Sequence, residues 1–176
     1  MIYVRTLKMG AAGIVVTTMP SDEFTATVET CTTGLSADRK LSSAASLFAW
    51  SQQKSNDNLR SFIASWSALE LLIFNLEKKY RNTFQGLLNS EDISLPVWDR
   101  DLSVIDIRDY HLRDRFYAVS CSINLPETAA DTEKFNKLNS KRNAYYHRFE
   151  IEDIELPTND VQSLFRKYLK IVLSES

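Results

Sequence analysis

The chain has 176 residues, of which 44% are hydrophobic and 25% are charged, and its formal net charge is −2. This length and composition predict one globular domain with a buried core and room for a small appendage. The slight negative charge excludes a polycation, so nucleic-acid binding would depend on a local basic patch. The four glycines form no phosphate-loop pattern, which argues against a P-loop or a dinucleotide-binding fold.

The two cysteines, Cys31 and Cys121, have no ligand-spaced partner, which argues against a zinc site. We expect two reduced, partly buried thiols in a cytoplasmic protein. The N-terminal segment has basic residues before an apolar run, as a signal peptide has, but Gly10 and Gly13 interrupt this short run. No stretch reaches the length of a membrane span, so no membrane partner is expected.

The first part of the chain, residues 1–35, has a β pattern. Apolar residues alternate with threonine and glutamate over residues 24–29, which is the period of a strand. Apolar groups within residues 2–7 and 14–16 predict one or two further strands. We therefore expect a small antiparallel β segment, followed by a separate helical domain over residues 36–176.

The rest of the chain predicts a bundle of four to five helices, so the fold class is mainly α. In the clearest helix, apolar residues recur every three or four positions: Phe62, Trp66, Leu69, Ile73, Leu76 and Tyr80. We assign these residues to the core and to no other role. Four other helices are expected. The first begins after a cap at residues 36–39, and the second spans 101–122. The third runs from Asp131 to about His147 or Phe149, and the fourth begins at the cap 158–160. They are separated by a break at 55–57, a loop over 82–99, a stop at 125–127 and an acidic connector over 151–157.

A short polar motif, Arg142, Asn143 and His147, lies near the end of the penultimate expected helix. Each α-helical residue advances about 100°, so Asn143 and His147 are neighbours on one face. Arg142 lies about 140° from His147 on such a helix. The motif combines a cation, an amide and a proton shuttle, which are the groups needed to bind a phosphate and move a proton beside it.

This motif, together with the upstream segment from Arg60 to Glu70, resembles the HEPN domain superfamily. That family is defined by Arg-x(4–6)-His, commonly with a polar residue after the arginine. The segment Trp66-x-Ala68-Leu69-Glu70 is similar to an earlier helix of anti-phage (ApeA-like) HEPN proteins. The resemblance covers roughly residues 36–173 and leaves the β segment outside.

The resemblance implies a HEPN-like helical bundle that forms a homodimer and brings two motifs into one cleft. Many members are metal-independent endoribonucleases of toxin and antiviral systems, so the implied partner is RNA and no cofactor or metal is needed. Arg142 would bind the phosphate, Asn143 would orient it, and His147 would act as acid or base to leave a 2′,3′-cyclic phosphate. A possible further partner is an antitoxin or regulatory protein.

Two other interpretations stay open. HEPN bundles also serve as non-catalytic interaction or regulatory modules that bind a protein partner. The chain would alternatively be a helical domain unrelated to HEPN, with His147 a structural residue that complements the dipole at a helix C-terminus.

Glu70 lies at the edge of the apolar stripe on its helix, and a half-buried glutamate needs a partner. We expect an ion pair between Glu70 and Arg142 that orients the guanidinium. An ordinary boundary glutamate is the alternative.

Lys134, Lys137 and Lys141 form a basic stripe on the motif helix. Together with Arg148 and Tyr146 they are candidates for RNA binding, through phosphate contacts and base stacking. Alternatively, the lysines form an ordinary solvent-exposed face and Tyr146 lies at a dimer interface.

Some HEPN toxins carry a modified tyrosine two positions after the histidine. The residue here is Phe149, which argues against that form of regulation. The second histidine, His111, is expected on the surface of a helix. The acidic connector over 151–157 would repel RNA, so we expect it to point away from the cleft.

Overall fold

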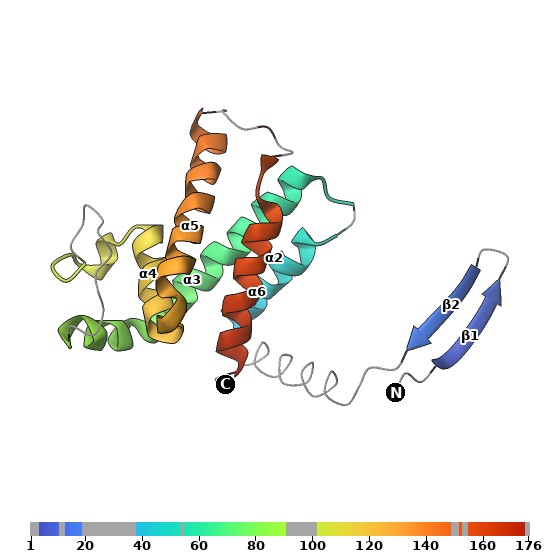
Figure 1. Cartoon of the computed structure of the whole chain (residues 1–176), viewed down its shortest axis with the longest axis horizontal. Coiled ribbons are helices and arrows are strands. Elements are labelled where there is room, and N and C mark those ends of the chain that lie inside the picture. Colours follow the sequence, from blue (N-terminus) through green and yellow to red (C-terminus); the bar gives the residue numbers. More distant parts are fainter. Residues whose placement is uncertain are drawn as a thin grey trace.

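The computed structural model describes residues 4–10, 13–18, 38–53, 55–90, 102–148, 152 and 155–174. In the first two ranges, and at Ile107, Leu125, His147 and Arg148, only the backbone is described. Within these residues the protein is mainly helical, with α2 (Arg39–Ser51), α3 (Asn58–Asn89), α4 (Leu112–Ile123), α5 (Thr128–Asn143) and α6 (Thr158–Ser174) (Figure 1). The expected mainly helical class is confirmed.

Two strands, β1 (Val4–Gly10) and β2 (Gly13–Thr18), pair antiparallel. The predicted strand over residues 24–29, like Cys31, lies outside the described residues. The β segment as a separate packed unit therefore stays a prediction.

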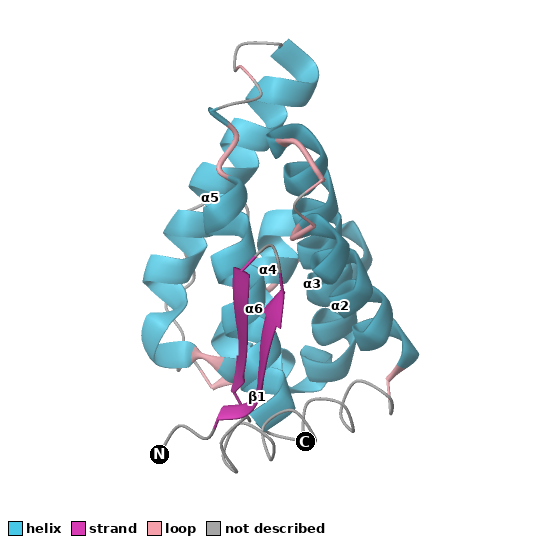
Figure 2. Ribbon diagram, turned by 90° about the vertical axis from the view of Figure 1, so that its right-hand side faces the viewer, coloured by secondary structure: helices cyan, strands magenta, loops and turns pink. Residues whose placement is uncertain are grey.

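Helix α3 is the centre of the bundle and contacts α2, α4 and α6 (Figures 1 and 2). It begins where the sequence predicted a break, because the carboxylate of Asp57 accepts the backbone N–H of Arg60 at 2.7 Å. The predicted apolar stripe forms its buried face: Phe62, Trp66, Leu69, Leu72, Ile73 and Leu76. Helix α2 likewise begins at its predicted cap, Asp38.

A ladder of aromatic rings joins four helices inside the bundle. Trp66 of α3 stacks on Phe135 of α5 at 5.8 Å between ring centroids, and Phe135 stacks on Phe116 of α4 at 4.3 Å. Phe116 lies 5.1 Å from the ring of Tyr168 on α6. All four side chains are nearly inaccessible to water, so their packing fixes α5 against α3.

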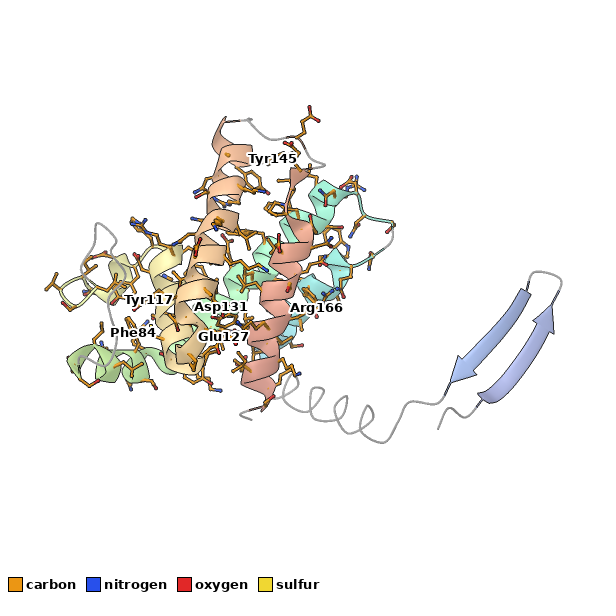
Figure 3. The ribbon with its side chains drawn as sticks, viewed as in Figure 1. Phe84, Tyr117, Glu127, Asp131, Tyr145 and Arg166 are labelled. Carbon is orange, nitrogen blue, oxygen red and sulfur yellow. The ribbon has the colours of Figure 1, made fainter. Side chains whose placement is uncertain are left out.

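The predicted loop over residues 82–99 is wrong at its start, because α3 continues to Asn89. Phe84 is buried and packs edge-on against Tyr110 and Tyr117 (Figure 3). Packing in this second hydrophobic cluster stabilises the last turns of α3. The buried members of the cluster are Phe84, Leu102, Tyr110, Tyr117, Ala118 and Cys121. Residues 91–101 lie outside the described residues.

The expected third helix over residues 101–122 is also wrong in its first half, since α4 begins only at Leu112. The carboxylate of Asp106 accepts the backbone N–H of Arg108, and the Tyr110 hydroxyl donates to the carbonyl of Leu102. These bonds stabilise turns and the short 3-10 helix η1 (Ile107–Asp109) instead of an α-helix. His111 is exposed as expected, but it is the N-cap residue of α4 rather than a helical residue.

Helix α5 begins three residues earlier than predicted, directly after the 3-10 helix η2 (Leu125–Glu127), which is the predicted stop. Asp131, the predicted start, instead lies inside the helix and faces α6 (Figure 3). Its carboxylate accepts hydrogen bonds from the Lys167 ammonium at 2.6 and 2.7 Å and from the Tyr168 hydroxyl at 2.9 Å. Lys167 also pairs with Glu127.

Another buried carboxylate joins α3 to α4. Glu77 is 2% exposed and bonds Arg81 at 3.0 Å and Arg115 at 2.8 Å. The Arg115 guanidinium also lies over the ring of Phe74, 5.0 Å from its centroid. Both charges on Glu77 and Arg115 are therefore compensated inside the bundle.

By length and composition, α3 is apolar and long enough to cross a membrane, which corrects the expectation that no stretch is. The most apolar 18-residue stretch of α3 is 50% buried inside the bundle. The core helix of a soluble protein meets the same two criteria, and the buried face of α3 makes the core contacts given above.

Candidate active site

The predicted motif lies where α5 changes into the π-helical turn η3 (Ala144–Arg148). In a π turn the hydrogen bonds join residue i to residue i+5, so each residue advances by less than the α-helical 100°. The backbone positions of Arg142 and His147, five residues apart, therefore lie closer to one face than the 140° predicted for a regular α-helix. Single π turns inside helices are frequent at functional sites.

The Arg142 guanidinium is held by its neighbours on three sides. Its Nη1 donates to the side-chain oxygen of Asn143 at 3.0 Å. Its Cζ lies 5.1 Å from the centroid of the Tyr146 ring and 6.0 Å from that of Trp66. The side chain is 31% exposed, so it is oriented and still reaches solvent.

The other edge of this guanidinium, Nε and Nη2, makes no hydrogen bond with a described residue. Nε is buried without a partner, and Nη2 lies 3.9 Å from the carboxylate of Glu70. Elsewhere in this chain the same edge does bind carboxylates: Arg81 uses it to bind Glu77, and Arg108 uses it to bind Asp106. In Arg142 this edge, which is suited to a carboxylate or phosphate, makes no hydrogen bond to a described residue, although its Nε is buried.

The predicted ion pair between Glu70 and Arg142 is present, at 3.9 Å, but the shortest contact of Glu70 is with a different residue. Its Oε1 accepts the indole N–H of Trp66 at 2.7 Å. Trp66 was assigned to the core alone, so its polar role was missed. The signal was the i,i+4 spacing from Trp66 to Glu70, which places the two side chains one turn apart on α3.

Tyr146 is 38% exposed beside Arg142, and its ring meets Tyr145 edge-on at 5.4 Å. Burial of the phenol raises the pKa of Tyr146, so it is neutral at pH 7. Tyr145 is partly buried against the main core and lies between the ends of α5 and α6 (Figure 3). One tyrosine therefore packs inward and the other presents its ring at the site.

The three lysines of the predicted basic stripe have different surroundings. Lys134 pairs with Asp160 of α6 at 3.1 Å, and Lys137 pairs with Glu133 at 2.6 Å. Lys141 is exposed, and among the described residues it has no such pair. Lys141 lies one residue before Arg142 and is the lysine best placed to contact a ligand there.

Several predicted features lie beyond the described atoms. The side chains of His147 and Arg148 are not described, and Phe149 and most of the acidic connector lie outside the described residues. The direction of the connector therefore stays a prediction.

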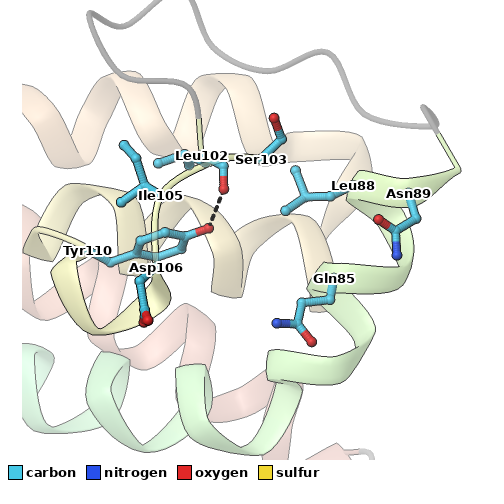
Figure 4. A pocket seen from close by; sticks show the side chains of 8 residues that line it. All are labelled: Gln85, Leu88, Asn89, Leu102, Ser103, Ile105, Asp106 and Tyr110. Carbon is cyan, nitrogen blue, oxygen red and sulfur yellow. Dashed lines mark hydrogen bonds between the residues drawn. The ribbon is translucent and has the colours of Figure 1, made fainter.

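A separate cavity of about 460 Å³ lies near the C-terminal end of α3 (Figure 4). Its lining residues are Gln85, Leu88, Asn89, Leu102, Ser103, Ile105, Asp106 and Tyr110. None of the predicted site residues lines it. Gln85 is fifteen residues after Glu70, which is about 22 Å along α3.

The described residues contain no group of three or more His, Cys, Asp or Glu side chains that could hold a metal ion. Comparisons of the chain with protein-family models, with curated proteins and with solved structures found no match.

Proposed function

We propose that this protein is a HEPN-type, metal-independent endoribonuclease of a toxin or anti-phage system, acting as a homodimer. The observation that carries the proposal is the free Nε/Nη2 edge of Arg142, held in place through Asn143 at the start of the turn that contains His147. A guanidinium that is fixed on one side and has unused donors on the other is suited to binding a phosphate.

The proposed chemistry needs only the groups of this chain. Arg142 binds the scissile phosphate and stabilises the charge that develops on its oxygens. Asn143 keeps the guanidinium oriented. His147 exchanges a proton with the reacting oxygens, and the exposed ring of Tyr146 gives a base a surface for stacking.

A second copy of the chain would complete the site. Ile63 and Phe74 lie on the face of α3 that carries Glu70, and they are 39% and 41% exposed. Leu71, on the flank of this face, is 40% exposed. Such a row of exposed apolar side chains suits an interface that places two Arg142 sites opposite each other.

The test is an RNA cleavage assay with EDTA present, comparing the wild type with Arg142→Ala and His147→Ala. We expect wild-type products with 2′,3′-cyclic phosphate ends, and a loss of at least about 100-fold in each variant. Circular dichroism and light scattering would verify that the variants fold and dimerise. Cleavage that survives in both variants would refute the proposed roles.

The alternative is a non-catalytic module that binds a protein partner through the same exposed face of α3. The ion pairs of Lys134 and Lys137 favour it, because they neutralise much of the basic stripe. On this alternative, the wild type cleaves no RNA and Phe74→Asp abolishes partner binding while Arg142→Ala does not.

A further inference from the structure

The carboxylate of Glu70 is arranged differently from those of Glu77 and Asp106, which form hydrogen bonds with arginines. Glu77 and Asp106 bond their arginines at 2.6 to 3.0 Å. Glu70 instead lies 3.9 Å from Arg142, and its close partner is the neutral indole of Trp66 at 2.7 Å. Neutralising Arg142 is therefore not what orients Glu70.

Trp66 holds one oxygen of this carboxylate in a fixed place. The indole is 3% exposed and is stacked between Phe62 and Phe135, at 6.1 and 5.8 Å between centroids. Its N–H occupies Oε1, while Oε2 makes no hydrogen bond with a described residue. Oε1 is also the oxygen that lies 3.9 Å from Nη2 of Arg142, and 31% of the side chain is exposed, so Oε2 is the oxygen left without a hydrogen bond to a described residue.

We propose that Glu70 is a catalytic residue, the base that takes the proton of the ribose 2′-hydroxyl, and that Trp66 is its positioning residue. This inference rests on the proposed ribonuclease function. The 2′-oxygen forms a bond to phosphorus as its proton moves to Oε2 of Glu70. The bond from phosphorus to the 5′-oxygen breaks, and that oxygen takes a proton from His147. The products are a 2′,3′-cyclic phosphate and a 5′-hydroxyl.

Two substrates distinguish the loss of the proposed base, Glu70, from the loss of the proposed acid, His147. One is a mixed-sequence RNA oligonucleotide, whose leaving 5′-oxygen needs a proton. The other is a mixture of nucleoside 3′-(4-nitrophenyl phosphates), whose leaving group departs without one. We expect Glu70→Gln to lose at least about 100-fold in kcat on both substrates. His147→Ala should lose as much on the RNA but less than about tenfold on the nitrophenyl esters.

The matched control is Glu133→Gln, which changes an exposed glutamate on α5 and should leave both rates unchanged. Trp66→Phe keeps an aromatic ring and the charge of Glu70 but removes the N–H, and should lower kcat on both substrates by at least about tenfold with KM unchanged. This variant tests the inference even if Glu70→Gln does not fold.

The outcomes distinguish the inference from the function on which it rests. An active wild type whose Glu70→Gln variant keeps its rate on both substrates would overturn the role of Glu70 alone. A Glu70→Gln defect confined to KM would do the same. A wild type that cleaves neither substrate would overturn the proposed function and this inference with it.

Discussion

Replacing Glu77 with glutamine should destabilise the bundle strongly, although the change is isosteric. One oxygen that accepts a guanidinium N–H becomes an amide donor facing that guanidinium. Arg81 is 38% exposed and can turn toward water, but Arg115 is only 13% exposed. Arg115 keeps its hydrogen bond to the carbonyl of Tyr110 at 3.1 Å but loses the negative charge of Glu77.

The magnitude follows from this difference in exposure. Removing one partner of a buried ion pair costs about 3–5 kcal/mol. Because Arg81 can be solvated, we expect the lower end, about 3 kcal/mol in the free energy of unfolding. For a domain of this size that lowers Tm by about 6–12 °C.

The assay is equilibrium unfolding in urea followed by far-UV circular dichroism, with a thermal scan beside it. Glu133→Gln is the matched control, because its pair with Lys137 is exposed on both sides at 69% and 72% and therefore contributes little to stability. A loss below about 1 kcal/mol for Glu77→Gln, or an equal loss in both variants, would refute the assignment of Glu77 as a buried link between α3 and α4.

Three further predictions concern the bundle and the site. Burial raises the pKa of the Tyr168 phenol above its usual 10.0, so the folded state binds more protons than the unfolded state above that pH and loses stability as pH rises. Tyr168→Phe should have a free energy of unfolding about 1–3 kcal/mol below that of the wild type at pH 7. Between about pH 9 and 11 the variant should lose less stability than the wild type does. Urea titrations measure both effects, and a pH slope equal to that of the wild type would contradict the prediction. Gly86→Ala should raise the free energy of unfolding by about 0.5–1 kcal/mol, because nothing lies within 4 Å of the added Cβ in the helix; a loss in the same titration would count against it. Arg142→Lys should lower RNA cleavage at least about 100-fold without changing Tm by more than about 2 °C, since lysine has no bidentate edge; a rate near wild type would show that charge alone suffices.

The elements predicted correctly are those whose signals are local. The stripe from Phe62 to Tyr80 requires only a helical period, and Asp57 caps α3 through its own backbone neighbours. The last turns of α3 were missed because Gly86 and Pro96 resemble a loop in sequence, whereas the contact that stabilises them, between Phe84 and Tyr117, joins residues far apart in the chain.

The candidate site shows the same division. The proximity of Glu70 to Arg142 was predictable, because an amphipathic helix places a half-buried glutamate at a defined edge. The pairing of Lys134 with Asp160 was not, since it depends on how α6 packs beside α5. The π turn was missed as well, because nothing in the spacing of Arg142 and His147 distinguishes it from an α-helix.

The division of the core into two clusters along α3 has a consequence for slow motions. The main cluster includes Trp66 and Phe135, whereas the smaller one is centred on Phe84 and Tyr117. We expect the two clusters to open separately, with different protection of their amides against hydrogen exchange. The end of α3 near Asn89 can then unfold locally and refold many times while the half that carries Glu70 stays intact. Local unfolding of α3 near Asn89 would thus leave the geometry around Arg142 unchanged.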